Sequence, residues 1–216
     1  MDAAEYDAWY GTPRGRWIGE TEFRLAQRLL DSRSPESLLD VGCGTGWFTR
    51  RFAATGMAAT GLDLNGDWLA FARRQSGAKT AWLEGDARHL PFEDQSFDAV
   101  VSIAALCFIQ EERQALAEIV RVSRRRFAVG WLNRASLLHY SRAGQGAYRG
   151  ATWRTSDEIR GLFHGLPVCN LIIRSAGFLP NGGWIAEMLS MAFCILSQVS
   201  SASPACNGLA SGCART

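Results

Sequence analysis

The stretch that decides the fold of this chain is Leu38-Leu39-Asp40-Val41-Gly42-Cys43-Gly44-Thr45-Gly46. An apolar strand ends there in an acid, and three alternating glycines follow before a helical pattern begins. Glycine adopts positive φ and lets the backbone approach a ligand closely, and a helix that begins near Gly46 adds unpaired N–H groups. The stretch therefore predicts a loop that binds a nucleotide-type cofactor. A tight strand-to-helix turn without a ligand is the alternative.

The spacing of the glycines separates two cofactor classes. The dinucleotide fingerprint G-x-G-x-x-G needs a third glycine at position 47, where this chain has Trp47. The pattern D-x-G-x-G-x-G instead resembles the first motif of class I S-adenosylmethionine (SAM)-dependent methyltransferases. This resemblance implies that the loop contacts SAM through Asp40, Gly42, Cys43, Gly44 and Gly46. Cys43 is expected to be a small filler there rather than a nucleophile.

Short apolar runs alternate with helical patterns from Ser37 onward, which favours βαβ units and a parallel sheet. The predicted strands are 38–41, 58–62, 80–83, 99–103 and 127–131, and the predicted helices between them are 47–55, 67–75 and 111–122. The resemblance implies a Rossmann-like, doubly wound, mostly parallel seven-stranded sheet flanked by helices, the class I methyltransferase fold. It covers Tyr6 to Trp131 well and fades beyond that point.

The segments outside this core are expected to cover it and close it. A helix is predicted over 19–31, after an irregular aromatic segment from Tyr6 to Trp17, and Ser156 is predicted to cap a later helix. Closing strands are predicted over 168–174 and 183–186. The resulting organisation is a methyltransferase domain over 1–196, composed of a leader (1–36), a cofactor-binding core (37–131) and substrate-side elements (132–196), followed by a disordered tail over 197–216.

Acids follow the second and third strands, where ligands of open α/β sheets bind. Asp63, with Leu64 beside it, is predicted to accept hydrogen bonds from both ribose hydroxyls of a nucleoside. A helix cap is the alternative for Asp63, but Asn65 or Asp67 can supply that cap instead.

The resemblance implies that the Asp86 side chain meets the adenine amino group and that the Ala87 N–H meets a ring nitrogen. A plain turn is the alternative for Asp86. The resemblance also makes Asp98 structural and places the reacting methyl group beside residues 104–108.

The N-terminal segment resembles the leader that folds over the cofactor in many of these enzymes. Arg16 or Arg14 is a candidate for pairing with the methionine carboxylate of SAM as a bidentate fork, with a solvated arginine as the equal alternative. Tyr6 and Tyr10 are expected either to close the pocket against water or to anchor the leader.

A sulfonium cofactor carries its own leaving group, so methyl transfer is an in-line displacement that needs no metal and no covalent nucleophile. Some acceptors also need a general base. His139 follows the fifth strand and is the first candidate for the general base or for a contact to the substrate. The alternative is a partly buried histidine that forms its hydrogen bonds with the backbone. Arg121 and the run from Arg124 to Arg126 are predicted to end a helix and to be structural.

The composition excludes several classes. With 216 residues the chain has room for one domain, and its net charge of +2, with basic residues spread along the chain, does not predict a nucleic-acid partner. The six cysteines show no metal-site spacing and are expected to be free thiols of a cytoplasmic protein. The apolar segment 184–199 is interrupted by Glu187 and too short to span a membrane, so it is expected in the core.

The leading hypothesis is a SAM-dependent methyltransferase that acts on a small or medium organic acceptor. A catalytically silent SAM-binding or partner-binding protein of the same fold is the alternative. An oxidoreductase is disfavoured by Trp47. The acceptor and the oligomeric state are left open by the sequence.

Overall fold

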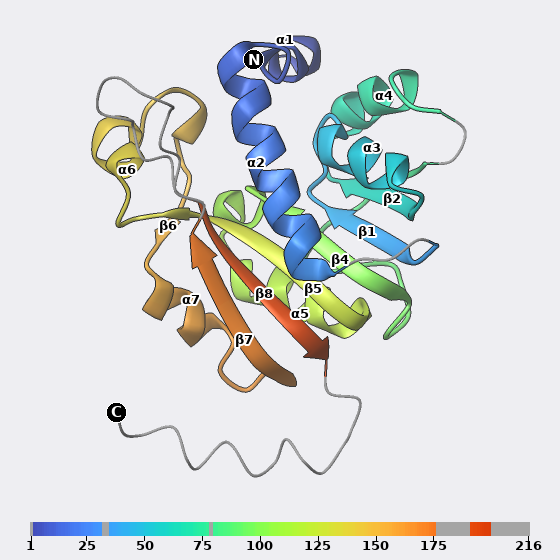
Figure 1. Cartoon of the computed structure of the whole chain (residues 1–216), viewed down its shortest axis with the longest axis vertical. Helices are drawn as coiled ribbons and strands as arrows, with labels where there is room; N and C mark the ends of the chain where they lie inside the picture. Colours follow the sequence, from blue (N-terminus) through green and yellow to red (C-terminus); the bar gives the residue numbers. More distant parts are fainter. Residues whose placement is uncertain (1, 32–34, 78–79, 176–190, 200–216) are drawn as a thin grey trace.

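One twisted sheet organises the molecule in a computed structural model that describes residues 2–31, 35–77, 80–175 and 191–199 (Figure 1). Its main path has the order β3-β2-β1-β4-β5-β8-β7, and the two-residue β6 pairs with β5. The strands are β1 (Ser37–Val41), β2 (Ala58–Asp63), β3 (Ala81–Glu84), β4 (Phe97–Ile103), β5 (Ser123–Asn133), β6 (Trp153–Arg154), β7 (Val168–Ser175) and β8 (Met191–Val199).

The strand directions confirm the predicted fold class. Strands β1 to β5 run parallel to one another, whereas β8 is antiparallel to both β5 and β7. The chain winds outward from β1 through β2 to β3 and then returns to β4 on the other side of β1. The strand order therefore reverses between β1 and β4, and ligands of open α/β sheets bind at such a point.

Helices cover both faces of the sheet. Side chains of α2 and α3 share one apolar cluster, and side chains of α5 and α7 share the other. Figure 1 shows α2 crossing one face, with α1 and α6 near its beginning. The helices are α1 (Ala3–Trp9), α2 (Pro13–Leu30), α3 (Trp47–Ala54), α4 (Gly66–Arg74), α5 (Glu112–Val122), α6 (Leu137–Arg142) and α7 (Ser156–Leu162), with 3₁₀ turns η1 (Leu106–Phe108) and η2 (Gly146–Tyr148).

Neighbouring residues of the central strands belong to different clusters because side chains alternate across a strand. Leu38 packs with α2 and α3, while Leu39 packs on the opposite side with α5. Ala128 and Phe127 of β5 divide in the same way. Burial on both faces explains why these strands are continuously apolar in the sequence.

The prediction of an irregular segment from Tyr6 to Trp17 is wrong. Asp2 caps α1 by accepting from the Glu5 N–H at 2.7 Å, and Thr12 caps α2 by accepting from the Gly15 N–H at 3.0 Å. Helix α2 therefore begins at Pro13 rather than at residue 19. A threonine cap followed by proline at the first helical position is a helix-start signal that the aromatic content of the segment obscured.

Smaller corrections concern the second half of the chain. Thr155, not Ser156, caps α7, in a capping box with Glu158. The predicted strand over 168–174 is confirmed as β7, whereas the predicted strand over 183–186 lies outside the described residues. Strand β8 runs to Val199, past residue 197, where the tail was predicted to begin, and residues 200–216 lie outside the described part.

The expectation of free thiols holds for two buried cysteines and fails for a third. Cys43 and Cys107 are free, but Cys169 is disulfide-bonded.

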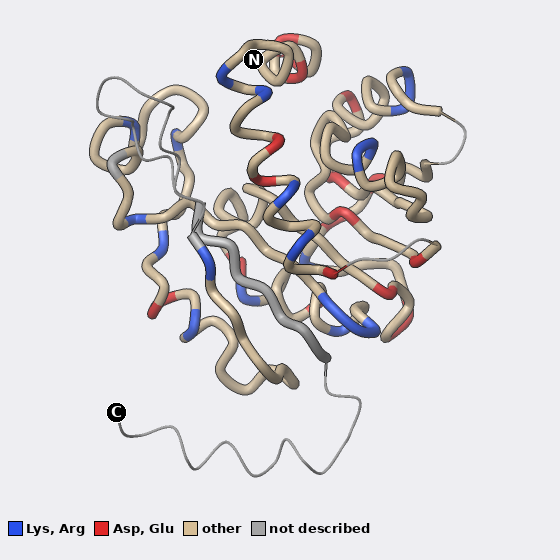
Figure 2. The backbone as a smooth tube through the Cα atoms, in the orientation of Figure 1, with Lys and Arg blue, Asp and Glu red and all other residues tan. Residues whose placement is uncertain are grey.

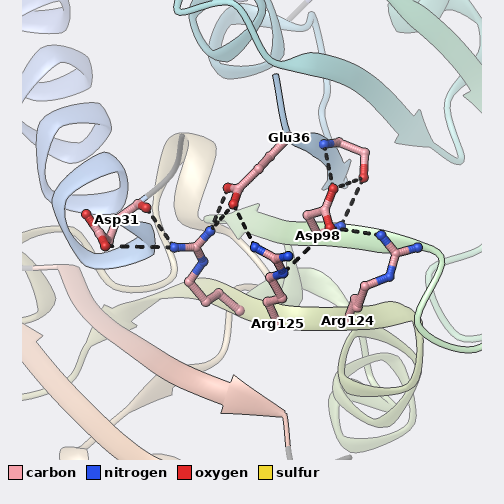
Figure 3. A network of polar contacts seen from close by, with 7 residues as sticks. Asp31, Glu36, Asp98, Arg124 and Arg125 are labelled. Atoms are coloured by element: carbon pink, nitrogen blue, oxygen red, sulfur yellow. Dashed lines mark hydrogen bonds and ion pairs between the residues drawn. The ribbon is translucent and has the colours of Figure 1, made fainter. Parts of the chain in front are cut away.

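The arginine run after α5 lies in β5 and not at a helix end, although its structural role is confirmed (Figure 3). Asp98 accepts from the Ser37 N–H at 3.0 Å and from Arg124 Nη1 at 2.8 Å. Arg126 pairs with Glu36 at 2.5 Å. This network ties together the amino ends of β1, β4 and β5, so it stabilises the edge of the sheet that is opposite the strand ends where ligands bind.

Figure 2 shows acidic and basic residues interspersed along the helices and strand ends, in keeping with the net charge of +2. Among the described residues, no helix combines the length and the apolar character that crossing a bilayer requires.

Candidate functional site

The carboxyl ends of β1, β2, β3 and β4 surround a cavity of about 720 Å³, which we call the cofactor cavity. It lies at the point where the strand order reverses. Its lining comprises Tyr6, Tyr10, Asp40, Gly42, Cys43, Gly44, Thr45, Trp47, Phe48, Leu62, Asp63, Leu64, Trp68, Gly85, Asp86, Ala87, Arg88, Ile103, Ala104, Ala105, Phe108, Ile109, Gln110, Glu111 and Ala147. Of the residues predicted to bind the cofactor, all but Gly46, Arg16 and its alternative Arg14 line this space.

The glycine loop is held open by backbone hydrogen bonds to the neighbouring strand. The N–H groups of Gly42 and Cys43 both donate to the Leu62 carbonyl, at 2.7 and 3.0 Å. Gly42 has φ +73°, and a Cβ there would lie 2.3 Å from the Cβ of Ala105. Only glycine therefore fits at this position, where the loop passes close to the end of β4.

The other two glycines have different neighbours. A Cβ on Gly44 would lie 3.2 Å from the Trp68 ring, on the lining of the cavity. A Cβ on Gly46 would lie 2.2 Å from the Trp82 ring, and Gly46 does not line the cavity. Gly46 therefore serves the packing of the turn into α3, and the prediction that it contacts the cofactor has no support from its position.

Asp63 is positioned by two backbone donors. Its Oδ2 accepts from the Gly44 N–H at 2.7 Å, and its Oδ1 accepts from the Asn65 N–H at 2.9 Å. Asn65 caps α4, so Asp63 is not needed for that role. Each carboxylate oxygen can accept a further hydrogen bond, so Asp63 can still accept two ligand hydroxyls.

Two buried groups that can titrate belong to the end of β1 and to the glycine loop, Asp40 and Cys43. Burial raises the pKa of Asp40 to about 7, against the opposing hydrogen bond that it accepts from Thr49 Oγ1 at 2.5 Å. Burial also raises the pKa of the Cys43 thiol well above its usual range. Cys43 is therefore a protonated thiol at neutral pH, as expected for a space-filling residue and not for a nucleophile.

Asp86 belongs to an ion-pair bridge at the rim of the cavity. Hydrogen bonds from Arg88, with Nη2 to Oδ2 at 2.7 Å, lower the pKa of Asp86 to about 2. Arg88 Nη1 also donates to Glu111 at 2.8 Å. This bridge joins the loop after β3 to the start of α5. Arg88 and Glu111 were not predicted from the sequence, because nothing in their spacing pairs them.

Aromatic rings close the cavity on the side of the N-terminal segment. The Tyr10 ring stacks on Trp47 with centroids 4.4 Å apart, and the Tyr6 ring lies 4.9 Å from that of Trp68. Burial raises the pKa of both tyrosines, so their hydroxyls are neutral. Trp68 was also missed, although its position in the first turn of α4 places it beside the end of β2.

The structure does not bring Arg16 or His139 to this cavity. Arg16 is exposed on α2 and donates to the Gly11 carbonyl at 3.4 Å. The His139 ring packs edge-on against Trp153 at 5.2 Å, and its Nδ1 is buried with no hydrogen-bond partner in the described part of the chain. The assignment of His139 as base therefore has no support from the geometry. Arg14 lines a separate cavity, described below.

Comparison with known proteins identifies the domain. Residues 39–126, which include the glycine loop, Asp63 and the Asp86 turn, match the family model described as a methyltransferase domain. The chain has the fold of the class I SAM-dependent methyltransferases, and residues 39–126 match their methyltransferase domain. The match contains β1 to β4 and ends within β5.

Curated relatives match different shares of the chain. An uncharacterized protein of Mycobacterium tuberculosis is 37% identical over 172 residues, which cover 74% of this chain and 56% of that protein. A malonyl-[acyl-carrier protein] O-methyltransferase of Erwinia pyrifoliae is 39% identical over 108 residues, which cover 49% of this chain and 41% of the relative. The chain thus spans about half the length of the curated relatives it matches.

Solved structures confirm the fold. The magnesium protoporphyrin IX methyltransferase of Synechocystis, solved with bound S-adenosylhomocysteine (SAH), superposes with a TM-score of 0.68 at 15% identity. The match covers 91% of this chain and 95% of that one. It therefore extends well beyond residues 39–126.

Proposed function

We propose that this methyltransferase binds SAM in the cofactor cavity and transfers its methyl group to a small or medium organic acceptor. The observation that carries the proposal is that four strand ends meet at one cavity. The glycine loop, the carboxylates of Asp63 and Asp86 and several aromatic side chains line it. Its volume of about 720 Å³ lies in the range of roughly 300–1,000 Å³ that is typical of small-molecule sites.

The residues present fit SAM in three places. The missing Cβ of Gly44 leaves room for a ligand against Trp68, and the backbone from Gly42 to Gly44 would hold the methionine part. Asp63 would accept from the ribose hydroxyls with its remaining lone pairs. Asp86 and the Ala87 N–H would hold the adenine ring.

The protein mainly positions and shields the reactants. SAM, when bound, supplies the methyl group and its own leaving group. Tyr6 and Tyr10 exclude water from one side of the cavity, and the protonated Cys43 thiol does not compete as a nucleophile. Ala104, Ala105 and Phe108, which follow the end of β4, border the space where the acceptor would approach.

Calorimetry with SAM and SAH tests the binding half of the proposal. We expect Asp63→Ala to weaken both ligands by about 100-fold, because two hydrogen bonds to a charged acceptor are lost. Gly44→Val should abolish binding by filling the space against Trp68. Asp67→Asn is the matched control, because Asp67 lies on the exposed side of the same helix start. Tight binding that survives Asp63→Ala and Gly44→Val would refute the site.

Methyl transfer tests the catalytic half. The wild-type chain, incubated with methyl-labelled SAM and a broad metabolite extract, should yield a labelled small-molecule product that Asp63→Ala does not form. Binding of SAM without any labelled product would instead favour a catalytically silent protein of this fold.

A further inference from the structure

A second cavity of about 340 Å³ adjoins the cofactor cavity, and we call it the arginine cavity. Ala147 lines both spaces, so the two adjoin at this residue. The arginine cavity is lined by Trp9, Arg14, Ile18, Leu138, Arg142, Gln145, Gly146, Ala147 and Tyr148. All of these residues belong to α1, α2, α6 and the segment up to η2, so they lie outside the family match over 39–126.

The charged residues of this lining have a single sign. Arg14 of α2 and Arg142 of α6 contribute two guanidinium groups, and the lining contains no acidic side chain. Arg14 and Arg142 come from distant parts of the sequence, and both line the same cavity as Tyr148. Burial raises the pKa of Tyr148, and the charges of the two arginines oppose that rise.

One acid also faces Tyr148 from behind this lining. Glu22 of α2 is buried, with 6% of its surface exposed, and its charge raises the pKa of Tyr148. Burial raises the pKa of Glu22 itself to about 8. The carboxyl is therefore mostly protonated at neutral pH and does not cancel the two arginines.

Apart from Gln145 and the backbone of Gly146, the other side chains of this lining are apolar or aromatic. Trp9, Ile18, Leu138 and the ring of Tyr148 form walls that suit an organic body rather than a hydrated ion. Arginine binds carboxylate and phosphate groups through paired N–H donors, and it tolerates partial burial better than lysine does. The combination is suited to an amphipathic anion.

We propose that the arginine cavity binds the anionic group of the methyl acceptor, a carboxylate or phosphate held by Arg14 and Arg142. The acceptor's reacting atom then lies in the cofactor cavity, on the far side of Ala147 and beside residues 104–108. This assignment rests on the proposed function, because only a methyltransferase makes the ligand of this cavity a methyl acceptor. It names the substrate class as an organic anion with an apolar body.

Binding of three matched probes to the full chain tests the inference. The probes are 3-phenylpropanoate, 2-phenylethyl phosphate and the neutral 3-phenylpropanol, titrated by ligand-observed NMR at low salt. We expect at least one anion to bind about tenfold tighter than the alcohol. Arg14→Gln and Arg142→Gln should each weaken that anion about fivefold and leave the alcohol unchanged. The preferred anion identifies carboxylate or phosphate as the recognised group.

Arg149→Gln is the matched control, because Arg149 follows η2, is exposed and lines neither cavity. Equal affinity for anions and alcohol, or equal losses in Arg142→Gln and Arg149→Gln, would overturn the inference. Titration of SAH into the same variants separates the two proposals. Intact SAH binding without anion selectivity refutes this inference alone, whereas anion selectivity without SAH binding refutes the proposed function.

Discussion

The two adjoining cavities differ in how the chain builds them. The cofactor cavity is formed mostly by strand ends and the turns that follow them, with short backbone hydrogen bonds fixing its loop. The arginine cavity is formed by helices α1, α2 and α6 and by the turn at η2. A parallel sheet therefore specifies the cofactor half, while the acceptor half depends on how separate helices pack over it. Substrate recognition can change in such helices without disturbing the cofactor site.

The strongest test of this contrast compares two glycines with the same backbone angle. Gly42 and Gly144 both have φ +73°, but a Cβ meets Ala105 at 2.3 Å only at Gly42, and Gly144 has open space. We expect Gly42→Val to weaken SAH at least about 100-fold, because steric overlap adds to backbone strain. Gly144→Val should cost only about 1 kcal/mol of unfolding free energy and keep SAH affinity. Calorimetry and urea denaturation measure both effects, and similar SAH affinities in the two variants would break the contrast.

The same contrast explains what the sequence could predict. The strand cores, the glycine loop and Asp63 follow from local rules, because parallel strands must be apolar and their carboxyl ends must meet at one edge. Asp98 was also assigned correctly, since its partners Ser37 and Arg124 begin the neighbouring strands β1 and β5.

Long-range packing escaped prediction. The Arg88–Glu111 bridge joins the loop after β3 to the start of α5, and the arginine cavity brings together Arg14 and Arg142 from two helices, so no local pattern reveals either. His139 failed for a related reason. Its place after β5 predicts the correct edge of the sheet, but packing against Trp153 turns its ring away from both cavities.

The charge state of Glu22, which the arginine cavity depends on, can be tested through the free energy of unfolding. Its pKa is about 8 in the folded chain and about 4.5 when exposed, so folding favours the protonated carboxyl. The stability that this proton confers is complete below pH 4.5 and is lost as the pH rises toward 8. We expect Glu22→Gln to match the wild type at pH 5 and to exceed it at pH 9 by on the order of a few kcal/mol.

Urea denaturation of both proteins at the two pH values measures the Glu22 effect. Asp40 also has a raised pKa, of about 7, but it is present in both proteins and cancels in the difference. A constant difference between Glu22→Gln and wild type across this pH range would show that Glu22 is solvated, and the arginines of the neighbouring cavity would then face a charged acid.

The smallest expected effect concerns the bridge at the cavity rim. Arg88 holds Asp86 at 2.7 Å and Glu111 at 2.8 Å, but its side chain is 37% exposed, so each pair contributes little stability. We expect Arg88→Gln to weaken SAH by about two- to fivefold, because Asp86 loses its fixed orientation toward the adenine site. Arg16→Gln, on the exposed side of α2, should leave SAH affinity unchanged. If calorimetry shows the larger loss in Arg16→Gln, the methionine carboxylate is held by the N-terminal helix, and the cofactor half is then not built by strand ends alone.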